Sequence, residues 1–248
     1  MPTANPRLYD PGSDYIGGYT PTDGTMEFYG RVRSRVSADS TVLDLGAGRG
    51  AWFEQDACER RVQVRSLKGL AKEVIGADVD EVVLSNRSTD RNIVIDKGID
   101  LPDKSVDVIV ADYVLEHVEK PEEFVSEINR ILVPGGTFCA RTPHKFHYVS
   151  IGAMMVRNSQ HSKAIGWLQP DRKAVDVFPT QYKLNTLGSI RRAFTNFEDL
   201  SYLYRSDPAY FFGSRAFYKF QYFMHGIMPA VPCSNIFAFL TKNSETVA

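Results

Sequence analysis

The chain has 248 residues, of which 43% are hydrophobic and 24% are charged. These proportions are those of an ordinary globular protein, and the length is sufficient for one large core. The formal net charge of −1 argues against nucleic acid or an anionic membrane surface as the main partner. Three cysteines lie far apart without the spacing of a metal site, so we expect buried, reduced thiols and no metal at Cys58, Cys139 and Cys233.

The sequence shows no targeting or membrane-spanning pattern. Residues 1–20 lack the basic start and apolar run of a signal peptide. No stretch reaches the roughly 18 apolar residues that a spanning helix needs. We therefore expect a cytoplasmic protein without a membrane span.

A glycine-rich turn follows the first apolar stretch. Residues 42–51 read Val-Leu-Asp-Leu-Gly-Ala-Gly-Arg-Gly-Ala, which predicts a buried parallel strand, a tight turn and a helix start. Such a turn brings backbone N–H groups close to a ligand. Asp44 favours a ligand with ammonium and sulfonium groups, such as S-adenosylmethionine, over an anionic pyrophosphate. However, Gly46, Gly48 and Ala51 also satisfy the dinucleotide fingerprint, so the turn alone leaves both cofactors open.

Two further apolar strands end in acidic residues. The second ends at Asp78, which is placed to accept hydrogen bonds from ribose hydroxyls. The third covers residues 92–95 and ends at Asp96 and Lys97, where a carboxylate and a backbone N–H could meet an adenine ring. Both features indicate a ligand that contains adenosine. The cofactor of a dehydrogenase contains adenosine too, so these features do not choose between the two cofactors.

The fourth predicted strand leads to the edge of the sheet where ligands bind. It covers residues 105–111 and is followed by Asp112 and Tyr113. In open α/β sheets the carboxyl ends of the strands form the ligand edge. Pro121 marks the start of a helix, and a fifth strand over residues 137–141 follows it.

These successive motifs resemble those of class I S-adenosylmethionine-dependent methyltransferases, most closely the type 11 branch that includes the ubiquinone-biosynthesis O-methyltransferases. The resemblance covers about residues 40–145 and is carried by residues 42–50, 75–80, 96 with 101–102, 107–118 and 127–136. It implies an α/β fold, with a Rossmann-like, seven-stranded, mostly parallel sheet, helices on both faces and an antiparallel last strand. It also implies S-adenosyl-L-methionine as the cofactor.

The resemblance further implies where each part of the cofactor binds. Asp44, Gly46 and Gly48 would line the methionine half. The ribose would lie against the end of the second strand, the adenine against the end of the third, and the transferable methyl near the end of the fourth. The remaining expected contacts are Asp78, Val79, Asp96, Lys97, Asp112 and Tyr113.

We expect a single methyltransferase domain over residues 1–248, built from four parts. These are an N-terminal strap or lid (1–38), a cofactor-binding core (39–145), an insertion over the acceptor site (146–184) and a completion of the core (185–248). The last part begins with a helix over residues 185–194, capped by Asn185, and a strand over residues 197–204.

A segment dense in Phe and Tyr covers residues 209–228. Aromatic density of this kind is most often buried core or a dimer face, so we expect a helical embellishment and a possible homodimer contact. A wall for a hydrophobic or lipid-linked substrate is a second interpretation. Interfacial contact with a membrane is a third.

Two histidines are the candidates for a catalytic base. Methyl transfer is an in-line displacement, so the enzyme must align the acceptor and, for a hydroxyl, remove its proton. His144 and His117 both follow strands at the ligand edge, and histidine titrates near neutrality. His144 is the stronger candidate, because the loop after the fifth strand often faces the acceptor, whereas His117 follows an apolar pair and could simply cap or pack at a helix start. Glu116 could orient His117 or share a metal with it, but two adjacent ligands do not make a site, and we expect none.

The leading prediction is transfer of a methyl group to a hydroxyl of a small-molecule, sugar or lipid-linked biosynthetic intermediate. An amine acceptor is the weaker variant. The chain has no strongly basic face, so we do not expect a nucleic-acid acceptor. A nicotinamide-dependent oxidoreductase would share the glycine turn and Asp78, but Asp44 argues against it. A non-catalytic, cofactor-binding partner subunit is the third alternative.

Overall fold

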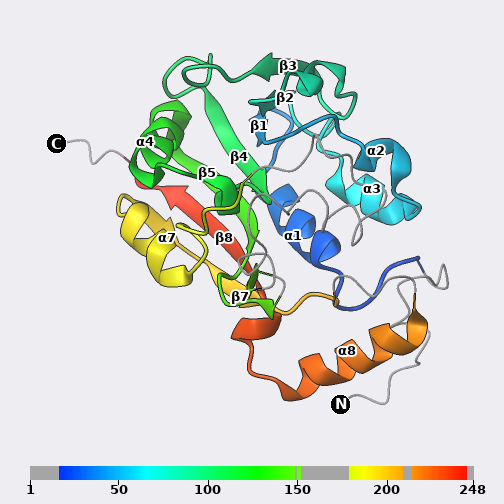
Figure 1. Cartoon of the computed structure of the whole chain (residues 1–248). Coiled ribbons are helices and arrows are strands. Elements are labelled where there is room, and N and C mark those ends of the chain that lie inside the picture. Colours follow the sequence, from blue (N-terminus) through cyan, green and yellow to red (C-terminus); the bar gives the residue numbers. More distant parts are fainter. Residues whose placement is uncertain (1–16, 149, 152–178, 209–213, 245–248) are drawn as a thin grey trace.

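A mixed β-sheet forms the centre of the computed structural model, which describes residues 17–148, 150–151, 179–208 and 214–244. Its strands lie in the order β3-β2-β1-β4-β5-β8-β6, with β7 also paired to β8 (Figure 1). The strands are β1 (Thr41–Leu45), β2 (Glu73–Asp78), β3 (Arg91–Val94), β4 (Val106–Asp112), β5 (Leu132–Pro143), β6 (Phe197–Asp199), β7 (Tyr202–Tyr204) and β8 (Asn235–Lys242).

The pairing confirms a mostly parallel sheet with an antiparallel last strand. The first five strands pair in parallel, whereas β8 runs antiparallel to β5, β6 and β7. The described strands number eight rather than the expected seven, because the single strand predicted over residues 197–204 is divided into β6 and β7. The division lies where the N–H group of Ser201 donates to the Asp199 carboxylate at 2.8 Å.

Helices cover both faces of the sheet, as expected. Figure 1 shows α4 and α7 on one face and α1 and α3 on the other. The α-helices are α1 (Gly24–Arg33), α2 (Trp52–Gln55), α3 (Glu59–Arg65), α4 (Pro121–Ile131), α7 (Leu187–Ala193) and α8 (Arg215–Ile227). Three short 3₁₀ helices are η2 (Glu81–Ser85), η3 (Leu115–His117) and η6 (Val231–Cys233). None of the helices in the described ranges is long and apolar enough to cross a bilayer.

Two apolar cores lie against the two faces of the sheet. Because successive side chains of a strand point to opposite faces, the continuous apolar runs of β1, β2 and β4 supply both cores at once. One core includes Leu43 and the α4 residue Ile128. The other includes Val42 and the α1 residue Phe28. All three cysteines are unbridged and buried, as the sequence predicts.

The caps of two helices show where sequence reasoning was right and where it was wrong. Pro121 stands at the start of α4, as expected. The predicted cap of α7 was wrong: Thr186, not Asn185, accepts the Ser189 N–H group at 3.0 Å and completes a capping box. Asn185 is buried instead, and its amide donates to the Thr142 hydroxyl at 2.6 Å.

The N-terminal strap is tied to the other end of the chain. The hydroxyl groups of Thr20 and Thr22 donate to the carboxylate of Asp207. The same carboxylate accepts the Tyr218 hydroxyl of α8 at 3.3 Å. Residues 1–16 of the expected strap, most of the expected insertion (149 and 152–178) and residues 209–213 of the aromatic segment lie outside the described residues.

Candidate active site

The glycine turn lies at the carboxyl edge of the sheet, between β1 and α2. Gly46 has a φ of 75°, and a Cβ atom there would lie 2.5 Å from the Cγ2 atom of Val114. Only glycine therefore fits this position. A Cβ atom on Gly48 would meet no heavy atom within 4 Å. The open space beside Gly48 leaves room for a ligand against the backbone of the turn.

The side chain of Asn86, which sequence reasoning missed, holds this turn from behind. Its amide group donates to the carbonyl oxygens of Ala47 and Gly48, each at 3.1 Å. Its side-chain oxygen accepts the Ser88 N–H group at 2.9 Å. Asn86 is buried. An asparagine just after a short helix looks like an ordinary turn former, so the sequence carries no signal for this role.

Asp78 joins the end of β2 to the glycine turn. Its Oδ2 atom accepts the Gly48 N–H group at 2.9 Å, and its Oδ1 atom accepts the Asp80 N–H group at 3.0 Å. Each carboxylate oxygen can accept more than one hydrogen bond, so both retain capacity for ribose hydroxyls. The neighbouring Val79 is exposed. The arrangement fits an adenosine ligand, and the role of Asp78 and Val79 toward it stays a prediction.

Asp44 lies half-buried beneath the turn, on the face of the sheet covered by α1 and α3. Burial raises the pKa of its carboxyl group to about 7, with Asp112 and Asp78 adding to the rise and Arg65 opposing it. Asp44, Arg65 and Trp52 border the same small cavity. Asp44 was expected to attract a cationic group of the cofactor. That group would compete with the Arg65 guanidinium for the Asp44 carboxylate.

Asp112, at the end of β4, is clamped by cations from two other elements. Its two oxygens accept Nε and Nη2 of Arg141, each at 2.7 Å. Arg65 of α3 lies 3.3 Å away, and the Tyr29 hydroxyl of α1 donates at 3.2 Å. Burial would raise the pKa of Asp112, but Arg141 and Arg65 outweigh it and hold that pKa below its usual value. Asp112 therefore stays ionised near neutral pH and serves the packing of β4 against β5.

Tyr113, Asp96 and Lys97 are three further exposed members of the predicted set. Tyr113 has a φ of 60°, and its ring, 43% exposed, lies 4.9 Å from the Arg141 guanidinium carbon. Asp96 and Lys97 are exposed just beyond β3. The Ile95 N–H group donates to the Asp78 carbonyl at 2.7 Å, so this loop leaves the sheet beside Asp78. All three stand at the carboxyl edge, and their contacts with a cofactor stay predictions.

His144, at the end of β5, is buried and is a hydrogen-bond donor in its neutral form. The Phe146 N–H group donates to its Nδ1 atom at 3.1 Å. The ring proton therefore resides on Nε2, an assignment that follows from the hydrogen bond. Burial lowers the pKa of His144. Burial, together with His225 and His144, lowers the pKa of the neighbouring His147 to about 4. These rings are neutral near pH 7.

His117, in η3 after β4, has the opposite arrangement. Its Nδ1 atom lies 3.0 Å from the carbonyl oxygen of Pro179. A carbonyl can only accept, so Nδ1 carries the proton and Nε2 carries the lone pair. Of the two predicted bases, His117 therefore has the tautomer that can take a proton, whereas His144 has the tautomer that can give one.

Glu116, which sequence reasoning considered as a partner for His117, also contacts β5. Its carboxylate is buried and accepts the Thr142 hydroxyl at 2.8 Å. Thr142 in turn accepts the Asn185 amide, so Glu116, Thr142 and Asn185 form a chain that links η3, β5 and the start of α7. Within the described parts of the chain, no cluster of His, Cys, Asp or Glu is arranged to hold a metal ion.

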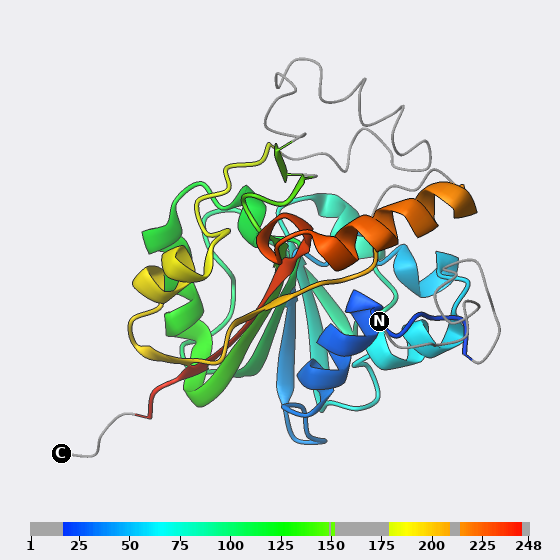
Figure 2. The same ribbon diagram turned by 90° about the horizontal axis from the view of Figure 1, so that it is seen from below.

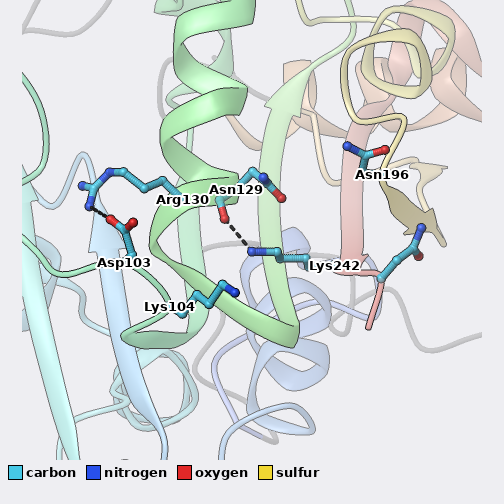
Figure 3. Close-up of a pocket in the computed structure, with 7 residues that line it drawn as sticks. Asp103, Lys104, Asn129, Arg130, Asn196 and Lys242 are labelled. Carbon is cyan, nitrogen blue, oxygen red and sulfur yellow. Dashed lines mark hydrogen bonds and ion pairs between the residues drawn. The ribbon is translucent and has the colours of Figure 1, made fainter. Parts of the chain in front are cut away.

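A separate hollow lies at the opposite edge of the sheet. It is lined by Lys104 and by residues near the ends of α4 and β8 (Figure 3). Arg130 in its wall is paired with Asp103 at 2.8 Å, and Lys242 donates to the carbonyl oxygens of Asn129 and Leu132 at 2.6 and 2.9 Å. Lys242 thus holds α4 to β8, and Arg130 holds α4 to the loop that contains Asp103. None of the predicted cofactor contacts lines this hollow.

Comparison with known proteins bears directly on the carboxyl-edge site. Residues 43–140, from β1 through most of β5, match the family model described as a methyltransferase domain. A Mycolicibacterium smegmatis protein named a probable S-adenosylmethionine-dependent methyltransferase is 34% identical over 125 residues, covering 48% of this chain and 44% of the relative. Both matches support the class I S-adenosylmethionine-dependent methyltransferase family for the part of the chain that they cover. The chain spans less than half the length of that curated relative.

Solved structures resemble this chain in fold over a wider range. The Bacillus subtilis YcgJ protein aligns over 88% of the chain and 99% of its own length, with 16% identity and a TM-score of 0.52. A geranyl diphosphate C-methyltransferase from Streptomyces coelicolor, solved with S-adenosyl-L-homocysteine, aligns over 88% of the chain and 74% of its own, with 13% identity and a TM-score of 0.54. At these identities the likeness concerns the fold alone.

Proposed function

We propose that the protein uses S-adenosyl-L-methionine to methylate a hydroxyl group of a small-molecule, sugar or lipid-linked biosynthetic intermediate. The proposal rests on the placement of the glycine turn, Asp78 and His117, which come at or after the ends of β1, β2 and β4 on the carboxyl edge of the sheet. The open space beside Gly48 and the remaining acceptor capacity of Asp78 suit an adenosine-containing cofactor. The family and its curated relative support the choice of S-adenosyl-L-methionine.

His117 is the proposed base for a hydroxyl acceptor. The cofactor supplies a methyl carbon that its sulfonium group has already activated. Transfer would break its carbon–sulfur bond and release S-adenosyl-L-homocysteine. Nε2 of His117, whose Nδ1 proton is held by the Pro179 carbonyl, would take the proton of the acceptor hydroxyl. A positioned base of this kind contributes about 10²–10⁴-fold to the rate. His144, with its proton on Nε2, is proposed to donate a hydrogen bond to the acceptor and thereby fix its orientation.

The Asp112–Arg141 pair supports this site without joining the chemistry. It fixes the backbone at the end of β4, from which both Tyr113 and η3 leave the sheet. Catalysis by alignment depends on such fixed backbone, because an in-line displacement tolerates little misplacement of the acceptor.

The test is a methyl-transfer assay with isotopically labelled S-adenosyl-L-methionine and a panel of hydroxylated and aminated acceptors. The proposal expects label on oxygen in at least one product, with a mass gain of one methylene and a methyl resonance typical of an O-methyl group. Label found only on nitrogen or carbon would overturn the choice of acceptor. Cofactor binding without any transfer would indicate the partner-subunit alternative, and oxidation of a reduced nicotinamide would indicate the dehydrogenase.

A further inference from the structure

Helix α8 presents an apolar face to solvent. Phe220, Phe223 and Ile227 recur at the spacing of one helix face and are 58%, 56% and 61% exposed, and Phe217 beside them is 38% exposed. Tyr218 and His225 on the opposite face are buried against the rest of the protein. A surface helix normally turns its apolar face inward, so an outward aromatic stripe indicates contact with something outside the described chain.

The orientation of α8 is fixed by contacts at both ends. Near its start, the Tyr218 hydroxyl donates to Asp207, which also holds the N-terminal strap. At its end, Arg205 donates to the carbonyl oxygens of His225 and Met228. The helix therefore cannot roll to bury the stripe without breaking these bonds. Figure 2 shows α8 lying across one end of the sheet, and β8 begins after it opposite Pro143, at the carboxyl edge.

The charged residues of α8 itself are all cations. Arg215 and Lys219 lie on α8, and the sequence contains no Asp or Glu between Asp207 and Glu245. The net charge of −1 belongs to the whole chain and does not describe this segment. In a two-fold contact between copies, α8 would meet α8 and its cations would find no carboxylate from this segment. An aromatic face flanked by cations is the pattern of helices that lie in the headgroup region of anionic bilayers.

We propose that α8 docks the protein on the surface of an anionic membrane, with its Phe–Ile stripe among the acyl chains and Arg215 and Lys219 at the headgroups. The net charge had argued against such a surface, and the local absence of acidic residues reverses that argument. Docking through α8 brings the carboxyl edge of the sheet close to the lipid. The inference concerns a surface and stands independently of methyl transfer.

The test is flotation of the full chain with phosphatidylglycerol–phosphatidylcholine vesicles and with pure phosphatidylcholine vesicles. We expect binding to the anionic vesicles. The double variant Phe220→Ser/Phe223→Ser should weaken it by about tenfold per side chain. The double variant Arg215→Gln/Lys219→Gln should weaken it by roughly fivefold per cation and reduce its salt dependence.

A matched control is Leu200→Ser, which removes an exposed side chain (64%) between β6 and β7 and should bind vesicles like the parent protein. Thermal unfolding of every variant checks that the fold is kept. Absence of flotation by the parent protein, or flotation that survives loss of both phenylalanines, overturns the proposal. Sedimentation showing a dimer that the phenylalanine variant dissociates, without flotation, would assign the stripe to a second copy instead.

Discussion

The Arg141 guanidinium donates two hydrogen bonds of 2.7 Å to the Asp112 carboxylate. The Arg141 side chain is 6% exposed and the Asp112 side chain is 5% exposed. The two residues come from neighbouring strands, β5 and β4, and the pair lies directly under the loop that carries Tyr113. Removing one partner of a buried ion pair leaves an uncompensated charge, which is far more costly than removing both.

Arg141→Met should therefore lower the free energy of unfolding by about 3–5 kcal/mol, because Asp112 then remains buried with less compensation. Adding Asp112→Asn should recover a large part of that loss. Urea denaturation of the parent, the single and the double variants measures both effects. A double variant as unstable as the single one would show that the cost comes from lost packing of Arg141 rather than from the stranded charge.

Asp44 should make the protein less stable as the pH rises. Burial raises its folded-state pKa to about 7, whereas the carboxyl group of the unfolded chain titrates near 3.8. Below about pH 4 both states are protonated. Between about pH 4 and pH 7 the carboxyl group ionises only in the unfolded chain, so the free energy of unfolding falls as the pH rises. Above about pH 7 the full loss of stability is present.

Asp44→Asn removes this titration. Its stability relative to the parent protein should rise by about 2–4 kcal/mol between pH 4 and pH 8. Chemical denaturation at a series of pH values measures the difference. A difference that stays constant over this range would mean that Asp44 is ionised in the folded protein throughout, held by Arg65.

Asp78→Ala should weaken binding of S-adenosyl-L-homocysteine by about 10–100-fold, because the variant loses both the proposed ribose contacts and the bond that holds Gly48. Asp103→Ala, at the opposite edge of the sheet, is the control and should bind normally. Calorimetric titration compares the two. Unchanged affinity in a folded Asp78 variant would contradict the placement of the adenosine beside β2.

His117→Ala should lower kcat by about 10²–10⁴-fold with a hydroxyl acceptor. His144→Ala should have a smaller effect on kcat and should raise KM, because a donor that orients the acceptor acts on binding. Cofactor affinity should be unchanged in both. The reverse ranking would restore His144 as the base.

Periodicity and turn chemistry predicted the sheet well because these signals are local. The runs ending at Leu45, Asp78 and Ala111 were recognised as strands, and β1, β2 and β4 end within one residue of these positions. The cap of α7 was misplaced by one residue because Asn185 and Thr186 both suit an N-cap. The choice depends on Thr142, whose hydroxyl accepts the Asn185 amide and is 43 positions away in sequence.

The geometry of the site depends on contacts between residues far apart in sequence, which local sequence patterns do not predict. Arg141 lies in a strand that was predicted from its apolar neighbours, and its partner Asp112 ends another strand. The tautomers of His117 and His144 follow from single backbone groups of Pro179 and Phe146. Sequence reasoning named both histidines and preferred His144, whereas the hydrogen bonds favour His117 as the base.

The most direct test of the account is calorimetric titration of the protein with S-adenosyl-L-methionine, S-adenosyl-L-homocysteine and NADH. The account predicts saturable binding of the first two at one site per chain and no binding of NADH. Binding of NADH alone would contradict it, because the glycine turn and Asp78 would then serve a dinucleotide and His117 would have no methyl transfer to assist.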